Sequence, residues 1–432
     1  MTFLDDLQWR GLIHQTTDDA GLGPWLAKQS RTVYAGFDPT GDSLHVGHLM
    51  GVLVLRRFQQ VGHRPIAVVG GATGMIGDPS GKSAERNLLT KEQLAHNIAA
   101  MTEQMRLFLD FDAGSSSALL VNNFDWTGPW SYLEFLRDVG KNFPVNVMLA
   151  KDSVKSRLGR GGDDDDPQAG MSYTEFSYML LQAYDFVHLH QQYGCELQAG
   201  GSDQWGNITA GIDLARRMRG AHLYGLTWPL LTKSDGTKMG KTESGAIWLA
   251  ADRTSPYQFY QYWINVDDAD AGASLRKLTD LSREEIESLD AVRAADPAKR
   301  DSQRRLAEEL TRLVHSPDGL AAAQQATAIF FGAEVWNLTD AALGQIFADV
   351  PSKELAASRL SAPGLPIVDA LCEAGLAASK GEARRTVAQG GAYVNNRRVE
   401  AADYTLTLAD LASETVVVLR SGKKKYALLR FV

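Results

Sequence analysis

The chain has 432 residues, of which 44% are hydrophobic and 22% are charged, and its formal net charge is −8. These proportions are typical of a globular protein of two or three domains, and they exclude disordered and fibrous classes. The acidic balance argues against a protein that coats DNA, and because no run of about 18 apolar residues occurs, no membrane span is predicted.

Strand-like and helix-like segments alternate in the first 250 residues. Strands are predicted at Thr32–Phe37, Arg64–Gly71, Ala118–Asn122 and Cys195–Ala199, and helices at Gly47–Gln60, Thr90–Leu109, Trp130–Val139 and from about Asn207. Strands separated by helices form βαβ units, so the predicted fold class is α/β with a Rossmann-like parallel sheet in a catalytic domain at 1–250. An insertion at about 122–170 includes Gly159–Gly170, whose four aspartates predict a solvated loop rather than a cation site.

The second half of the chain has a different composition. From Ser255 to Phe347 strand signals disappear and Ala, Leu, Glu and Arg dominate, which predicts a helical domain at 251–350. Val350–Gly364 is typical of a linker. Beyond it, a small α+β domain at 365–432 is predicted from a helical segment at Val368–Gln389 and β-rich segments at Ala392–Val394, Thr415–Leu419 and Tyr426–Phe431.

Charge and cysteine usage differ along the chain in informative ways. Leu365–Val432 carries 10 Lys and Arg against 7 Asp and Glu, a net charge of +3, so the remainder carries −11. A mildly basic tail domain on an acidic body is consistent with local binding of RNA. The two cysteines, Cys195 and Cys372, lie far apart without CxxC or CxxH patterns. They predict neither a zinc finger nor a disulfide framework, and they are typical of a reducing cytoplasm.

The junction between the first predicted strand and helix has the composition of a nucleotide site. Its sequence, FDPTGDSLHVGH, places Asp38 and Thr40 after the strand and His45, Gly47 and His48 at the start of the helix. Ligands of open α/β sheets bind beyond the carboxyl ends of strands, and helix amino termini bind phosphates. Two histidines on a helix are more often cap or core residues, but this context favours nucleotide binding, with Gly47 leaving room for a flat base.

A second cluster is the loop Leu231–Thr242, which ends in the motif KMGKT. Lys238 and Lys241 are mobile cations that can stabilise charge on a leaving pyrophosphate without any acid or base. A lysine-rich loop by itself is usually solvated surface. Together with the earlier HVGH motif it is a specific signature.

These two motifs resemble the HxGH and KMSKS pair of class I aminoacyl-tRNA synthetases. Three further stretches, GGATGMIGDPSGKSAER, SYTEFSYMLLQAYDF and GGSDQWGNITAG, are similar to the bacterial tyrosyl-tRNA synthetase family, and the resemblance spans nearly the whole chain. It implies an enzyme that activates L-tyrosine with ATP and transfers it to the terminal ribose of tRNA(Tyr). Mg²⁺ arrives with ATP, and we predict no permanently bound cofactor or metal. A homodimer with contacts from about Asn122 to Lys155 is also implied.

The resemblance assigns roles around the tyrosine. Ser172 and Glu175 predict a helix start, so that Tyr178, Gln182 and Asp185 share one helix face; a structural hydrogen-bond network fits this stripe as well. By resemblance, Tyr178, Gln182 and Asp78 bind the ammonium group of tyrosine, whereas Tyr34 and Asp185 bind its phenolic hydroxyl. The family match also places two glutamines near the tyrosine and the adenylate, Gln198 and Gln204.

Other roles concern ATP and its transition state. Gly201 and Asp203 follow a predicted strand and suit a ribose, although a helix N-cap fits them too. The ATP-binding set is Asp38, Gly47, Gly201, Asp203 and Lys241. Thr40, His45 and His48 are expected to steady the phosphates. Charge in the transition state is neutralised by Lys82, Arg86, Lys238 and Lys241.

The tail sequence ASKGEARRTVAQGGAYVNNRRV resembles an RNA-binding module of a small-subunit ribosomal protein. By that resemblance Arg384, Arg385, Arg397 and Arg398 contact RNA phosphates, which position RNA without reading its sequence. A charge cluster alone is more often a solvated face.

Two alternatives stay open. A tryptophanyl-tRNA synthetase shares the scaffold, but Tyr34, Asp185 and the basic tail argue against it. The other is an RNA-binding scaffold without catalysis, against which the intact histidines and lysines argue.

Overall fold

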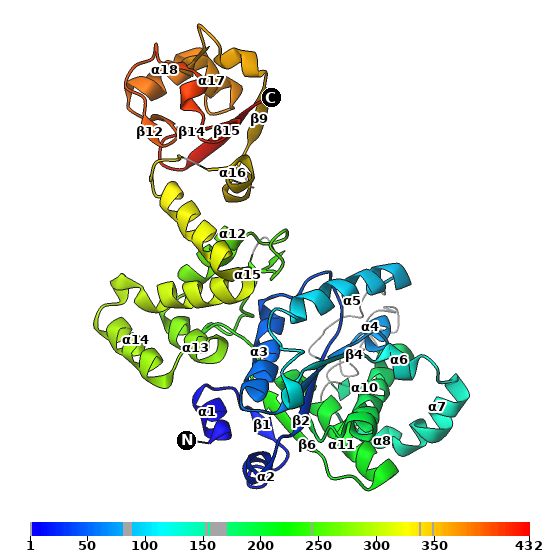
Figure 1. The fold of residues 1–432 in the computed structure, drawn as a ribbon. Helices are drawn as coiled ribbons and strands as arrows, with labels where there is room; N and C mark the ends of the chain where they lie inside the picture. Colours follow the sequence, from blue (N-terminus) through cyan, green and yellow to red (C-terminus); the bar gives the residue numbers. More distant parts are fainter. Residues whose placement is uncertain are drawn as a thin grey trace. The chain divides into compact units, whose positions relative to one another are not determined.

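The structure is a computed structural model that describes residues 2–80, 89–151, 154–155, 171–242, 245–336, 338–347 and 350–432. The chain forms two compact units, Met1–Thr254 with Trp263–Val314, and Ser255–Tyr262 with His315–Val432 (Figure 1). The predicted acidic loop Gly159–Gly170 lies outside the described residues. Within the described residues, each helix is too short or too polar to cross a bilayer.

The first unit contains a six-stranded sheet with the order β1-β6-β5-β2-β3-β4. Strands β2 to β6 pair in parallel, and β1 pairs antiparallel with β6. This confirms the predicted parallel α/β sheet. The strand β6 is missing from the prediction because its sequence YGLTW is short, contains a glycine and precedes a proline. The strand bounds are β1 Gln15–Thr16, β2 Thr32–Phe37, β3 Arg64–Val69, β4 Leu119–Asn122, β5 Leu197–Gly201 and β6 Tyr224–Trp228.

The order of these strands reverses between β2 and β5, since β3 and β4 lie on one side and β6 on the other. The crevice at such a switch point, beyond the carboxyl ends of the strands, is where open α/β sheets bind ligands. Tyr34 of β2 and Phe186 of α10 belong to the buried core behind it. The helices that surround the sheet are α1 Phe3–Trp9, α2 Leu22–Lys28, α3 Val46–Gln60, α4 Thr73–Ile76, α5 Lys91–Met105, α6 Phe124–Thr127, α7 Tyr132–Asp138, α8 Val145–Leu149, α10 Tyr173–Tyr193 and α11 Trp205–Arg219.

Between Pro256 and Ile346 the described residues form helices and connecting turns, which confirms the predicted helical region. The longest helix, α15, is kinked at Ser316, where φ is 70° and ψ is 169°, next to Pro317. This kink lies beside the boundary of the two units at Val314 and His315. The α-helices of the region are α12 Pro256–Ile264, α13 Asp268–Leu278, α14 Arg283–Ala295, α15 Asp301–Phe330 and α16 Asp340–Ile346.

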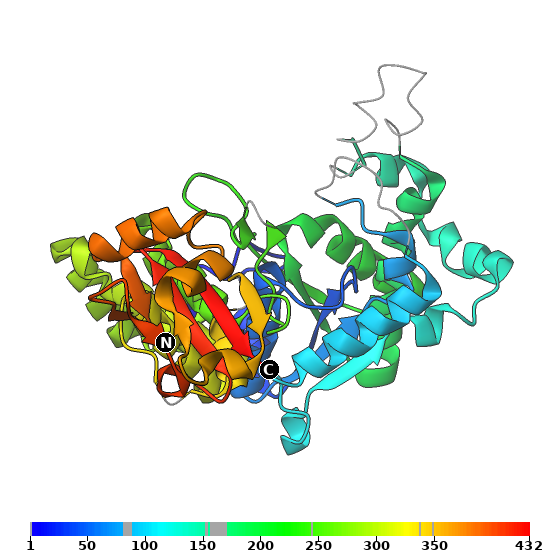
Figure 2. The ribbon, with the colours of Figure 1, turned by 90° about the horizontal axis from the view of Figure 1, so that it is seen from above.

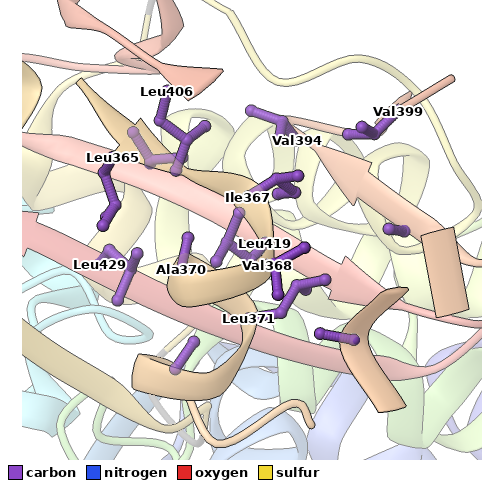
Figure 3. Packing of buried hydrophobic residues seen from close by; sticks show 14 of the residues in the cluster. Leu365, Ile367, Val368, Ala370, Leu371, Val394, Val399, Leu406, Leu419 and Leu429 are labelled. Atoms are coloured by element: carbon purple, nitrogen blue, oxygen red, sulfur yellow. The ribbon is translucent and has the colours of Figure 1, made fainter. Parts of the chain in front are cut away.

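The second unit contains a five-stranded sheet with the order β12-β11-β14-β15-β9. Figure 2 shows its long strands β14 and β15 side by side in red. Alternate residues of β14 enter two different apolar clusters, because side chains alternate between the faces of a strand. Val417 and Leu419 pack with α17, as Figure 3 shows for Leu419, whereas Val416 and Val418 pack with α15 and α16. The elements are β9 Ser352–Leu355, β10 Leu365–Pro366, α17 Ile367–Glu373, α18 Lys380–Ala388, β11 Ala392–Val394, β12 Arg397–Arg398, β13 Thr405–Leu406, β14 Val416–Ser421 and β15 Lys425–Phe431.

Two predictions about this unit are wrong. Val350–Gly364 was expected to be a linker, but Ser352–Leu355 forms β9 and pairs in parallel with β15. This edge strand is exposed and carries charges, so it lacks the apolar signal of a strand. Val368–Gln389 was expected to be one helical segment, but two helices form, because Gly375 takes a φ of 70° after α17.

Candidate active site

A cavity of about 360 Å³ opens at the carboxyl ends of β2 and β5, in the first unit. It brings together residues that are distant in sequence, from the strands, from the start of α3, from the middle of α10 and from the lysine loop. Lys82 and Arg86 lie outside the described residues. The predicted catalytic, tyrosine-binding and ATP-binding residues that line it are Tyr34, Asp38, Thr40, His45, Gly47, His48, Asp78, Tyr178, Gln182, Asp185, Gln198, Gly201, Asp203, Gln204, Lys238 and Lys241.

One end of the cavity holds two buried polar groups that have no hydrogen-bond partner within the described part of the chain. Tyr34 and Gln198 face each other across the β2–β5 pair. The Tyr34 hydroxyl and the Gln198 Oε1 are both buried, and neither forms a hydrogen bond with any described residue. Burial, followed by the charge of Asp185, raises the pKa of Tyr34 well above its usual value, so its hydroxyl stays a neutral donor. An orphaned buried polar atom costs about 1–3 kcal/mol, so a polar ligand would be bound strongly here.

Asp185, from α10, supplies the acceptor at the same end. Its carboxylate accepts hydrogen bonds from Asn123 Nδ2 at 3.1 Å and from Trp126 Nε1 at 2.8 Å. Burial raises the pKa of Asp185 to about 7, and the two hydrogen bonds oppose that rise. The carboxylate is therefore held in one orientation, and it can accept a hydrogen bond from a phenol that Tyr34 also contacts.

Asn123 and Trp126 are site residues that the sequence analysis missed. Trp126 lies within the stretch predicted for the dimer contact, but its own side chain is buried and stacks on His188 with ring centres 4.4 Å apart. The short helix α6 directs this indole toward Asp185. The spacing of residues within the segment does not indicate this contact. Thr73 was missed as well; its hydroxyl accepts from Asn123 at 3.0 Å and donates to Asp38 at 2.7 Å.

A second polar group in the cavity, around Asp38 and Asp78, gathers oxygen atoms that suit an ammonium group. The predicted helix start is confirmed, since the Ser172 side chain caps α10. On that helix, the Tyr178 hydroxyl donates to Asp38 at 3.0 Å. Gln204 Nε2 donates to Asp78 at 2.7 Å, and Gln182 Nε2 donates to Gln204 Oε1 at 3.3 Å. Burial first, then Asp38, raises the pKa of Tyr178, which therefore stays neutral beside the carboxylates.

The amino terminus of α3 carries the two histidines. His45 caps the helix, since its Nδ1 accepts from the backbone N–H of Gly47 at 3.0 Å, and His48 Nδ1 accepts from the N–H of His45 at 3.3 Å. The two rings are stacked with centres 3.9 Å apart. Because both Nδ1 atoms accept, each neutral ring carries its proton on Nε2 and can donate from there. A Cβ on Gly47 would lie 2.8 Å from the His45 ring, so glycine also makes room for this cap.

The lysine loop is a hairpin whose base is fixed to α3. Thr232 and Lys238 form a β-bridge, and β7 (Lys241–Thr242) pairs with β8 (Gly245–Ala246). Gly240 has a φ of 80°, and a Cβ there would lie 2.8 Å from Val46 Cβ. This explains why glycine stands where the general KMSKS signature has serine. No cluster of three His, Cys, Asp or Glu side chains suited to a metal occurs among the described residues.

Comparison with known proteins identifies the protein family to which the chain belongs. Residues 27–332 match the family described as tRNA synthetases class I (W and Y), and residues 342–429 match the tyrosine–tRNA ligase SYY-like C-terminal domain. The chain is 58% identical to the tyrosine–tRNA ligase of Rhodopirellula baltica, over 99% of this chain and 96% of that one. The chain belongs to the tyrosine–tRNA ligase family. It is also 53% identical to the tyrosine–tRNA ligase of Roseiflexus castenholzii, over the whole of both chains.

Solved structures agree with this membership of the tyrosine–tRNA ligases. A C-terminally truncated mitochondrial tyrosyl-tRNA synthetase of Aspergillus nidulans is 31% identical with a TM-score of 0.68, over 76% of this chain and 94% of that one. A tyrosyl-tRNA synthetase of Archaeoglobus fulgidus is 19% identical with a TM-score of 0.52, over 74% of this chain and 100% of that one, and shows the shared fold. The predicted class I aminoacyl-tRNA synthetase is confirmed, so the chain is an enzyme.

In the tail of this member of the tyrosine–tRNA ligase family, all four arginines predicted to bind RNA are exposed. Arg397 forms an ion pair with Glu334 at 3.0 Å, and its guanidinium lies over the Trp336 ring. Arg384, Arg385 and Arg398 form no ion pair with any described residue. The exposed Lys423–Lys425 turn lies beside them, because the N–H of Gly422 donates to Gly391 at 2.7 Å.

Proposed function

We propose that the chain activates L-tyrosine with ATP to tyrosyl-adenylate and transfers the tyrosine to the 3′-terminal ribose of tRNA(Tyr), releasing pyrophosphate and AMP. The observation that carries this proposal is the buried Tyr34 hydroxyl, which has no partner among the described residues and lies close to the Asp185 carboxylate. A donor and an acceptor at the closed end of a cavity match a phenolic hydroxyl, which both accepts and donates.

The tyrosine then lies along the cavity with its ammonium group at the second polar group of the cavity. Asp78, Tyr178 and Gln182 offer oxygen atoms to that cation, and Gln204 holds Asp78 in place through a 2.7 Å hydrogen bond. Gln198 lies beside Tyr34 on the neighbouring strand. Phenylalanine lacks the hydroxyl and leaves buried polar groups unpaired, an effect for which tyrosyl-tRNA synthetases are themselves the usual example.

The remaining part of the cavity receives MgATP, in which the Mg²⁺ belongs to the substrate. Asp38, Gly47, Gly201 and Asp203 line this part of the chain's cavity and bind the nucleoside in our proposal, in which Thr40, His45 and His48 steady the phosphates. The tyrosine carboxylate attacks the α-phosphorus and pyrophosphate leaves, so the protein needs to supply only positioning and charge. The cations for the transition state are Lys82, Arg86, Lys238 and Lys241.

Transfer RNA is held by the other parts of the chain. The division that we propose is a catalytic domain at 1–250 with an insertion at about 122–170, a helical anticodon-binding domain at 251–350, and an RNA-binding domain at 365–432 to which β9 is added. Arg384, Arg385, Arg397 and Arg398 contact phosphates, and the charge of Arg397 is already balanced by Glu334. The reaction takes place in the cytoplasm.

We also propose a homodimer built on the insertion. Among the described residues of this region, the exposed large apolar side chains are Phe124, Tyr132, Leu133, Val145, Val147 and Leu149. Exposed apolar groups in such number are characteristic of an interface. Sedimentation at micromolar protein should give twice the 47.1 kDa mass of the chain. Leu133→Asp should shift it to the monomer, and a monomeric unaltered chain would refute the proposal.

The amino acid that drives exchange of pyrophosphate into ATP tests the proposed function. Tyrosine should support exchange, and tryptophan and phenylalanine should not. The assay is best run near pH 8, about one unit above the Asp185 pKa of about 7, so that the carboxylate is ionised. Exchange with tryptophan in place of tyrosine would assign the chain to the other branch of its family. No exchange with any amino acid would favour a scaffold without catalysis.

A further inference from the structure

The lysine loop is anchored by a carboxylate from the helical region. Asp270 lies in the first turn of α13, its side chain is 6% exposed, and its Oδ1 accepts the backbone N–H of Ser234 at 2.7 Å. Ser234 lies in the tip of the hairpin, where Gly236 N–H donates to Lys233 at 3.0 Å. The buried Met239 lies between Lys238 and Gly240 at the base, and the Ser274 hydroxyl of the same helix contacts its sulfur at 3.8 Å. Helix α13 therefore touches the loop at its tip and at its base.

The other end of α13 is fixed to the catalytic body by two arginines. Arg57 donates to the carbonyls of Lys277 at 3.1 Å and Thr279 at 2.7 Å. Arg10 donates to the carbonyls of Thr279 at 3.2 Å and Leu281 at 3.0 Å. Both arginines are buried, and the carbonyls at a helix end need such partners. The carboxyl end of α13 is thus held against α1 and α3.

These contacts join the two signature motifs through rigid elements. Helix α3 has His45 and His48 at its amino end and Arg57 in its last turn. Helix α13 is held by Arg57 at its carboxyl end and holds the lysine loop through Asp270 at its amino end. The distance between the histidines and the lysines therefore depends on α3, α13 and the Asp270 hydrogen bond.

We propose that Asp270 is a positioning residue for tyrosine activation, which places Lys238 and Lys241 by holding the Ser234 amide. This inference rests on the proposed function of the same site. Asp270 touches neither substrate, so its effect reaches the reaction only through the loop. A neutral acceptor at position 270 should therefore serve the loop nearly as well as the carboxylate.

The test compares three variants by the rate of adenylate formation and by tyrosine affinity. Rates are expressed per tyrosine-binding site, so an unfolded fraction does not contribute. Asp270→Ala should slow adenylate formation about tenfold, the equivalent of one hydrogen bond of about 1.4 kcal/mol, while the tyrosine Kd stays unchanged. Asp270→Asn keeps an acceptor oxygen and should recover most of the rate. Asp267→Ala removes an exposed carboxylate at the N-cap of α13 that makes no side-chain cap, and should have no effect.

A double-mutant cycle separates positioning from a general structural role. In a background with Lys238→Ala and Lys241→Ala, Asp270→Ala should cost less than about twofold, because the cations that it positions are gone. An equal tenfold loss in both backgrounds, or an Asp270→Asn variant as slow as Asp270→Ala, would overturn the proposal. Absence of exchange in the unaltered chain would instead refute the proposed function.

Discussion

Replacing Lys241 by alanine should slow tyrosyl-adenylate formation by about 10²–10³-fold and leave tyrosine affinity nearly unchanged. Preorganised charges that act where negative charge develops contribute about this much in other active sites. Lys241 lies in the cavity wall at β7, a strand whose pairing with β8 fixes its backbone. The tyrosine contacts that we propose come from other elements, so we expect binding of the amino acid not to involve this ammonium group.

Single-turnover formation of adenylate, together with equilibrium dialysis of tyrosine, measures both quantities. Lys233→Ala is a matched control, because it removes the same charge from the same hairpin at a position that does not line the cavity. It should change the rate of adenylate formation by less than about threefold, which is the effect expected from removing one exposed charge. A weakened tyrosine Kd with an unaltered rate in Lys241→Ala would show that the lysine binds the ground state instead.

Removing the tail should separate amino acid activation from tRNA charging. A chain that ends at Gly332 keeps all the described cavity residues, and should retain tyrosine-dependent pyrophosphate exchange within about twofold. Transfer to tRNA should fall by about two powers of ten, since three lost phosphate contacts of about 1 kcal/mol each have that effect. The cut belongs at Gly332 rather than near Gly364, because a cut at Gly364 uncovers the apolar side chains of both α15 and α16, whereas a cut at Gly332 uncovers those of α15 alone.

A full-length variant with Arg384→Gln, Arg385→Gln and Arg398→Gln is the control for this truncation. These side chains are exposed, so the fold should be unaffected, while each lost phosphate contact should lower the salt slope of tRNA binding by about 0.7–0.9. Loss of exchange in a folded truncated chain would mean that the tail belongs to the catalytic unit. An unchanged salt slope in the triple variant would place the RNA contacts elsewhere.

The sequence by itself determined the parallel sheet, the helical region, the family and many of the residues that line the cavity, although not Thr73 or Asn123. The strand TVYAGF has the β-branched and apolar composition of a buried strand, and its predicted bounds match β2. The face of α10 with Tyr178, Gln182 and Asp185 followed from the helical repeat once Ser172 marked the start. Such features depend on neighbours within a few turns of the chain, which is why they can be read from local patterns.

Only the tertiary structure decided which groups meet across the sequence. Trp126 reaches Asp185 and Asp270 reaches Ser234, each through a hydrogen bond between segments that no periodicity relates. The edge strand β9 could not be predicted from the sequence for the same reason. Its stability comes from pairing with β15 and not from its own exposed sequence. A hydrogen bond forms wherever folding brings a donor to an acceptor, and local composition carries no record of that distant partner.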